Sequence, residues 1–472
     1  MTLRLLLVFS LLTSCSINPV TGNRDFVTMS EDSEIAMGQN YSVQVLQQVP
    51  AYKDKDLQAY VQMIGESLAK KSHRSNLIYR FTVLDSPDIN AFALPGGYIF
   101  INRGLMAYLS SEEELAAVLG HELGHVTARH SVRQMSQAQL IGFMSMIVGS
   151  QASRIAGDIT NMAGGAFLAG YGREMELEAD KIGAEYMALD GYSPQGMMET
   201  LTVLKEQEIY SKKLSELRGQ EPKTYHGLFS SHPSNDKRLQ EVLISSQNLP
   251  IVSKKIKSNY LESIDGLVYG DSENAGIRRG SDFYHGPLNF HLKAPASWEI
   301  LNSQDRLGFL APKSQASLFF TMEDQNRRLS AKEYLERNKA FDIISGQNIS
   351  PDGLDAFTAI ASRGNSLYRL AVIFRDKNIY QFYGSVEQGS EFSDFDEQFL
   401  SIINSFRSLR NKEKLLAKPL KISSYVVKNG DSYSTLSKSS AIPYDPEGRL
   451  RLLNGDYPEG ELSVGSLIKI IE

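Results

Sequence analysis

The chain has 472 residues, which is enough for two to four domains that each bury a core of their own. Its formal net charge is −6, from 49 basic and 55 acidic residues, and this mild acidity argues against a nucleic-acid-binding surface. Charged residues make up 22% and hydrophobic residues 42% of the chain, as in an ordinary globular protein.

The first fifteen residues are typical of an export signal. Arg4 precedes an apolar run, Leu5 to Leu12, that is too short to cross a bilayer well. With Leu12-Thr13-Ser14-Cys15 it resembles a bacterial lipoprotein signal, in which Cys15 would carry the lipid and become the first residue after cleavage. The alternatives are an ordinary secretory signal or a short membrane anchor. Because Ser16 follows where an aspartate would favour the inner membrane, the resemblance implies anchoring to the outer membrane of a Gram-negative cell, facing the periplasm.

The next part of the chain is predicted to contain a tether, helices and a small sheet. Residues 16–30 are expected to form the tether, and residues 31–71 to be helical. Residues 80–84 alternate as a strand does, and residues 91–101 favour a hairpin around Pro95-Gly96-Gly97. An edge strand in this hairpin could pair with an extended peptide; the alternative is that residues 90–97 form only a turn.

The stretch His121-Glu122-Leu123-Gly124-His125 carries the strongest chemical signal. On a helix, histidines four residues apart project from one face, and two neutral imidazoles so placed can share one Zn²⁺. Glu122 would then take a proton from the attacking water. The alternative is a helix on which His121 and His125 only cap neighbouring carbonyls.

The helix that carries this motif is predicted to begin at Ser111, which with Glu114 is typical of a capping box. No proline interrupts residues 111–140, so Arg129 and His130 are expected on the same helix in structural roles. Residues 140–148 are too short for a transmembrane span and are expected to pack on this helix, or to cover the cleft as a mobile segment.

A cluster of acidic residues follows at residues 174–180. Glu176 and Asp180 are four residues apart and share a helix face. A catalytic zinc needs a third protein ligand, so one of the two could bind the metal while the other holds a ligand histidine by its second nitrogen.

Together these motifs resemble the gluzincin peptidases related to the prenyl-protease and HtpX families, and most of all the periplasmic BepA-like and LoiP-like metalloproteases. Residues 90–97 resemble the segment ahead of the active-site helix, and His232-Pro233 with Arg238 resembles a third family motif. The resemblance covers roughly residues 30–250. Unlike BepA-type relatives, the chain shows no 34-residue repeat of the tetratricopeptide kind.

The resemblance implies a role for each matching residue. His121, His125 and Glu176 would bind one zinc ion per chain, Glu122 would be the general base, and Asp180 would be a carboxylate behind the ligands or a proton donor. His232 could approach the metal as a regulatory fourth ligand or stabilise the oxyanion. The alternative is a histidine that only starts a helix before Pro233.

The C-terminal half is predicted to hold two further modules. After a bridge at residues 251–282, residues 283–410 are expected to form an α+β domain that weakly resembles PsbP-like domains. After a linker at residues 411–423, residues 424–472 resemble a LysM module, a small βααβ fold that binds peptidoglycan. Residues 442–457 are rich in proline and glycine and depart from that pattern, so a structural cap is the alternative.

The sequence therefore predicts an α+β multidomain chain with a mainly helical zincin-type peptidase domain at residues 31–250. The expected function is a zinc-dependent endopeptidase of the cell envelope. Misassembled outer-membrane or periplasmic proteins are the substrates that the resemblance implies, with outer-membrane assembly machinery as a partner. The alternatives are a non-proteolytic assembly factor and a peptidoglycan-associated binding protein.

Overall fold

The computed structural model describes residues 15–138, 171–217, 238, 240–242, 244, 260–302, 307–326 and 328–472. The expected packing or covering role of residues 140–148 and the expected role of His232 fall outside this range. Within the described residues, no helix combines the length and the apolar character needed to cross a bilayer.

The chain divides into two compact units, each of which is described by itself. The first contains residues 1–214, 222–267 and 421–472, and the second contains residues 215–221 and 268–420. The C-terminal segment thus belongs to the same unit as the histidine motif. The elements of the first unit are β1 (Cys15–Ile17), β2 (Arg24–Phe26), α2 (Glu31–Gln48), α3 (Lys55–Ala69), β3 (Arg80–Leu84), β4 (Ala91–Leu94), β5 (Tyr98–Asn102), α4 (Arg103–Met106), α5 (Glu112–Thr127), α8 (Arg173–Asp190), α9 (Gln195–Leu217), α12 (Tyr260–Ser263), β18 (Leu420–Val426), α15 (Tyr433–Ser437), α16 (Pro446–Leu453) and β19 (Leu467–Ile471).

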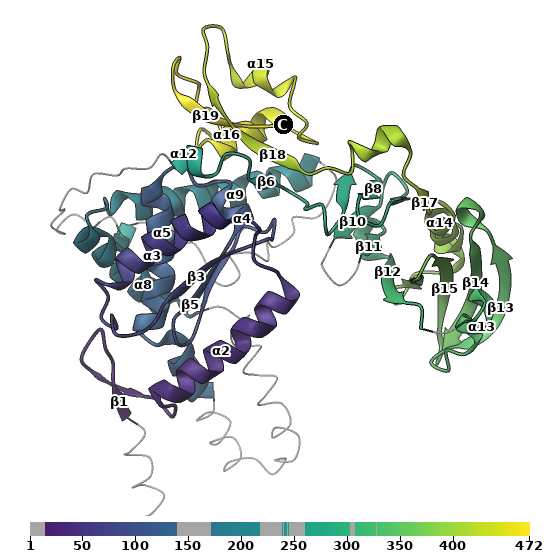
Figure 1. Ribbon diagram of the computed structural model, residues 1–472, viewed down its shortest axis with the longest axis horizontal. Helices are drawn as coiled ribbons and strands as arrows, with labels where there is room; N and C mark the ends of the chain where they lie inside the picture. Colours follow the sequence, from purple (N-terminus) through teal and green to yellow (C-terminus); the bar gives the residue numbers. More distant parts are fainter. Residues whose placement is uncertain are drawn as a thin grey trace, which may run out of the picture. The chain divides into compact units, whose positions relative to one another are not determined.

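A small sheet with the strand order β3-β5-β4 lies between helices (Figure 1). Strand β3 runs parallel to β5, and β4 runs antiparallel to it, so the predicted hairpin is confirmed and the turn-only alternative is wrong. The side chains alternate between the two faces. Phe92, Leu94 and Phe100 pack against apolar side chains of α2, whereas Phe81 of β3 packs against Gly65 of α3.

The motif helix α5 begins where the sequence predicts. Ser111 adopts an extended conformation and its hydroxyl accepts a hydrogen bond from the Glu114 amide at 3.1 Å. The Glu114 carboxylate accepts from the amide of Ser110 instead of Ser111, so only half of a strict capping box forms. The expected continuation of this helix through Arg129 and His130 is wrong. Helix α5 ends at Thr127, and Arg129 has a φ of 54°, in the left-handed region.

The C-terminal segment has the element order strand, helix, helix, strand, and it packs beside the start of α5. The buried Lys469 ammonium of β19 donates to the carbonyl of Leu109 at 2.7 Å, two residues before the helix cap. Burial lowers the pKa of Lys469 to about 7, against the opposing effect of Glu114. The Arg449 guanidinium of α16 donates to the Tyr108 hydroxyl at 2.9 Å. The resemblance of residues 424–472 to LysM modules stays a prediction.

The second unit is built around a seven-stranded antiparallel sheet with the order β10-β11-β12-β16-β15-β14-β13. Helix α14 and the indole of Trp298 close one apolar core through Phe399. Helix α13 covers a second core on Phe357 and Leu370. The elements are β6 (Val268–Tyr269), β7 (Ile277–Arg279), β8 (Asp282–His285), β9 (Phe290–Lys293), β10 (Glu299–Asn302), β11 (Leu307–Leu310), η1 (Pro312–Ser314), β12 (Ala316–Asp324), α13 (Ala331–Glu336), β13 (Asp342–Ile349), η2 (Pro351–Gly353), β14 (Asp355–Arg363), β15 (Ser366–Arg375), β16 (Asn378–Val386), α14 (Ser393–Asn404), β17 (Arg407–Ser408) and η3 (Asn411–Lys414).

A buried carboxylate ties the N-terminal helix to the end of the motif helix. Glu34 of α2 accepts hydrogen bonds from Arg74 at 2.7 Å and from Arg129 at 2.8 Å. Arg74 also donates to the carbonyl of Val126, in the last turn of α5. Two largely buried guanidinium groups therefore share one buried carboxylate.

We expect Glu34→Ala to lower the free energy of unfolding by about 3 kcal/mol, because it leaves two largely buried guanidinium groups without their shared carboxylate. The matched control is Glu31→Ala. Glu31 also binds Arg74, at 2.8 Å, but its side chain is 49% exposed, and its loss is expected to lower stability by less than about 1 kcal/mol. Equal effects of the two variants in denaturant unfolding would contradict this account.

Candidate metal centre

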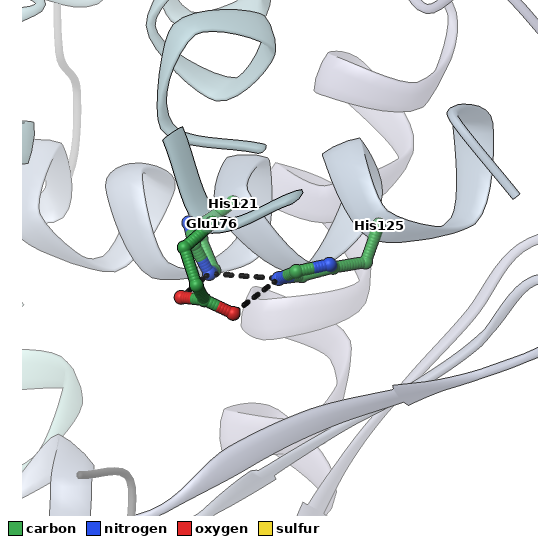
Figure 2. A group of neighbouring side chains, drawn as sticks. All are labelled: His121, His125 and Glu176. Atoms are coloured by element: carbon green, nitrogen blue, oxygen red, sulfur yellow. Dashed lines mark hydrogen bonds and ion pairs between the residues drawn. The ribbon is translucent and has the colours of Figure 1, made fainter. Parts of the chain in front are cut away.

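Three side chains with metal-binding atoms converge where α5 and α8 cross. His121 and His125 come from α5, Glu176 comes from the first turn of α8, and all three are buried. The Nε2 atoms of the two histidines are 3.0 Å apart, and each lies 3.5 Å from an oxygen of Glu176. Figure 2 shows the two rings and the carboxylate directed toward one another.

This spacing fits a tetrahedral zinc ion. Zinc bonds of 2.0–2.1 Å to nitrogen or oxygen set neighbouring ligand atoms roughly 3.3–3.4 Å apart. The ligand atoms of the three residues all lie within 4.8 Å of one another, so small adjustments bring them to that geometry. Two imidazoles and one carboxylate are also a donor set that zinc favours, and they leave a fourth position for other groups. Glu122 is adjacent to His121 on the helix and is only 1% exposed.

Glycine and alanine allow the two helices to approach closely enough for this convergence. A Cβ atom placed on Gly183 of α8 would lie 2.9 Å from the backbone carbon of Gly120 and the amide nitrogen of His121. One turn further along, a Cβ on Gly124 would lie 2.9 Å from the carbonyl oxygen of Ala179. The helices are therefore in backbone contact beside both histidines.

Asp180 contacts the nitrogen of His121 that points away from the cluster, and Arg238 contacts Asp180. The Nδ1 atom of His121 is 2.8 Å from Asp180 Oδ1, and both oxygens of Asp180 accept hydrogen bonds of 2.7 Å from Arg238. Arg238 Nη1 also lies 3.1 Å from Glu176. Burial acts to raise the pKa of Asp180, but the Arg238 guanidinium and His121 outweigh burial and hold it below its ordinary value.

The carboxylates of Asp180 and Glu176 favour a positive charge on His121. Burial acts to lower the pKa of His121, but hydrogen bonds with Asp180 and Glu176 outweigh burial and raise it to about 10. The same negative groups would stabilise a bound cation.

Comparison with known proteins identifies this part of the chain. Residues 55–244 match the family model described as peptidase family M48. This region is therefore similar to that peptidase family.

The chain also has similar bacterial and mitochondrial proteins. The chain is 31% identical over 278 residues to the beta-barrel assembly-enhancing protease of Yersinia pestis, covering 56% of this chain and 55% of the relative. It is 28% identical over 269 residues to the Escherichia coli (strain K12) protein of the same name, with 54% and 53% covered. It is 28% identical over 230 residues to the mitochondrial metalloendopeptidase OMA1 of Schizosaccharomyces pombe, with 48% and 64% covered. The chain thus spans about half the length of the bacterial relatives it matches.

Among solved structures, cyanobacterial PsbP from Synechocystis is similar at 12% identity with a TM-score of 0.24, over 29% of this chain and 94% of the other. The PsbP-like character of the second unit stays a prediction.

The second nitrogen of His125 has a partner that the sequence did not predict. His125 Nδ1 lies 2.8 Å from Nδ1 of His130, whose Nε2 lies 3.0 Å from Glu178. On its other side, the His125 ring stacks on Tyr171 with centroids 3.9 Å apart. Burial lowers the pKa of His130, although Glu178 opposes this shift. Residues five apart do not share a face of a straight helix, so the sequence did not indicate a contact between His125 and His130.

Strand β4 lies at the edge of the small sheet, near His125 of the candidate metal centre. Ala93, Leu94 and Pro95 lie close to His125 and to Arg129, just after the end of α5. In the described part of the chain, no strand pairs with the other side of β4.

The structure thus brings together His121, Glu122, His125, Glu176 and Asp180, whose roles in binding and catalysis stay predictions. It places Arg238, which the sequence suggested only through a family motif, in direct contact with Asp180 and Glu176. The fourth-ligand hypothesis for His232 stays a prediction.

We expect Gly183→Ala to weaken Zn²⁺ binding by about tenfold or more, because the added Cβ forces α8 away from His121. Equilibrium competition with a chromophoric chelator measures this change. Gly172→Ala is the control, since a Cβ at Gly172 meets no atom within 4 Å. Unchanged zinc affinity of Gly183→Ala would contradict the importance of this helix contact.

Proposed function

We propose that this chain is a zinc-dependent endopeptidase of the cell envelope. The observation that carries the proposal is the convergence of His121, His125 and Glu176 at tetrahedral spacing beside the buried Glu122. The match of residues 55–244 to the model of peptidase family M48 and the similarity to metalloendopeptidases support it.

Each residue of the candidate site has a distinct role in the proposed peptide hydrolysis. His121, His125 and Glu176 would hold zinc, which when bound supplies a Lewis acid that polarises the scissile carbonyl and acidifies water. Glu122 takes a proton from the attacking water and passes it to the leaving amine. Asp180 accepts from His121 Nδ1 and thereby keeps Nε2 directed at the metal, while Arg238 holds Asp180 in its ionised form.

The substrate would lie as an extended strand along β4. In an antiparallel pair, every second residue exchanges hydrogen bonds with its partner. The backbone amide of Asn102 in β5 donates to the carbonyl of Asn90. Phe92 and Leu94 follow Asn90 at every second residue, so their backbone N–H and C=O groups also point toward β5. The backbone groups of Ala91 and Ala93 therefore point to the open side of β4, where an added strand could pair with them.

The proposed substrate class is misfolded or misassembled outer-membrane and periplasmic proteins. The support is the name of the bacterial relatives, beta-barrel assembly-enhancing protease. The proposed location is the periplasmic face of the outer membrane, with a lipid on Cys15. Its support is the apolar run before the chain's only cysteine.

We expect Glu122→Gln to bind Zn²⁺ as the unmodified chain does but to cleave a denatured polypeptide at least about a hundredfold more slowly, because the general base is lost. Cleavage is followed by electrophoresis and metal content by elemental analysis. Glu113→Gln on the same helix is the matched control and should cleave normally. Normal cleavage by Glu122→Gln would refute the general-base role, and its full rescue of cells lacking the protein would favour an assembly factor.

We expect Cys15→Ser to move the protein from the membrane fraction to the soluble periplasmic fraction, because the lipid-bearing sulfur is gone. Fractionation of a Gram-negative host, with mass spectrometry of the mature N-terminus, measures this. A variant with Ser14→Ala, beside the cysteine, should remain in the membrane fraction. Membrane retention of Cys15→Ser would favour an anchor formed by the signal segment itself.

A further inference from the structure

We infer that His130 is a positioning residue that fixes the proton and the orientation of the proposed zinc ligand His125. The inference rests on the proposed metal site and assigns a role to a residue outside the motif. Its basis is one contact between two buried rings, with 2.8 Å between the two Nδ1 atoms.

The direction of the His125 ring determines which nitrogen can bind the metal. Its Nε2 faces the cluster, 3.0 Å from Nε2 of His121 and 3.5 Å from Glu176. A nitrogen that binds zinc carries no proton, so the proton of a neutral His125 must be on Nδ1. At 2.8 Å from His130 Nδ1, this N–H can donate only if His130 Nδ1 is an acceptor.

The surroundings of His130 favour that acceptor form. With Nδ1 unprotonated, the proton of a neutral His130 is on Nε2, which lies 3.0 Å from Glu178 Oε2. Glu178 also accepts from Arg133 at 2.9 Å, and Arg133 pairs with Asp25 of β2 at 3.1 Å. In this arrangement His125 donates to His130, and His130 donates to Glu178, so each hydrogen bond has one donor and one acceptor.

The break in the helix makes this contact geometrically accessible. At 3.6 residues per turn, a straight helix would place residues five apart roughly 140° from each other around its axis. The left-handed conformation of Arg129 turns the chain so that His130 faces back toward His125. Arg129 is held there by hydrogen bonds to Glu34, to the Ser16 hydroxyl and to the Met29 carbonyl.

The two proposed ligand histidines therefore have different outer partners. His121 donates to the carboxylate of Asp180, whereas His125 donates to an imidazole that in turn donates to Glu178. Loss of a partner that orients a metal-bound histidine typically weakens metal binding ten- to a hundredfold.

The test compares three full-length variants: His130→Asn, His130→Gln and His130→Ala. Asparagine places its amide where Nδ1 was and can still accept from His125, whereas glutamine places its amide where Nε2 was and keeps only the contact with Glu178. We expect Zn²⁺ affinity, measured by competition with a chromophoric chelator, to stay within about threefold for His130→Asn. We expect it to fall ten- to a hundredfold for His130→Gln and His130→Ala.

His291→Asn is the matched control, because His291 is also buried and its Nε2 lies 2.7 Å from a carboxylate, Asp282, in the second unit. Its zinc affinity should equal that of the unmodified chain. Equal affinities of His130→Asn and His130→Gln, or an unchanged affinity of His130→Ala, would overturn the positioning role alone. Failure of the unmodified chain to bind Zn²⁺ would overturn the proposed function and this inference with it.

Discussion

The backbone contact between α5 and α8 is the constraint on which the rest of the site depends. Gly120 and Gly124 on one helix meet Ala179 and Gly183 on the other, so no side chain separates the two backbones. Glycine within a helix costs about 1 kcal/mol relative to alanine, and here the close approach offsets that cost. It lets the short side chain of Glu176 reach two imidazoles that project from the neighbouring helix.

The charges around the buried cluster are arranged in pairs that support it from outside. Arg238 compensates Asp180 and reaches Glu176, Arg133 compensates Glu178, and each carboxylate in turn holds a histidine. Buried charges without partners are strongly destabilising, so these pairs make it feasible to keep several carboxylates near one point. A cation bound between the histidines and Glu176 would add to this balance instead of disturbing it.

Local sequence patterns were sufficient for much of the fold, and they singled out the three residues that the structure brings together as a candidate metal site. The cap at Ser111, the alternation of β3 and the hairpin of β4 and β5 are set by neighbours in sequence, and the structure confirms them. The turn at Arg129 could not be predicted, because contacts with Glu34, Ser16 and Met29, about a hundred residues away, hold its conformation. The contact of His130 with His125 depends on that turn and could not be predicted from the sequence for the same reason. The glycines of α5 were a visible signal, since glycine in a helix interior often marks close packing.

Both ends of the motif helix are held by segments that are distant in sequence. Lys469 of the C-terminal segment donates to Leu109 just before the helix cap, and Arg129, just after the helix, donates to Ser16. Ser16 follows Cys15, so a lipid on Cys15 would be joined to a segment that contacts the turn carrying His130. Residues 16–30, which the sequence predicts as a tether, include the hairpin of β1 and β2, and Asp25 in that hairpin pairs with Arg133. In the proposed envelope protease, the segment that connects the domain to the membrane would therefore also belong to the outer support of the metal centre.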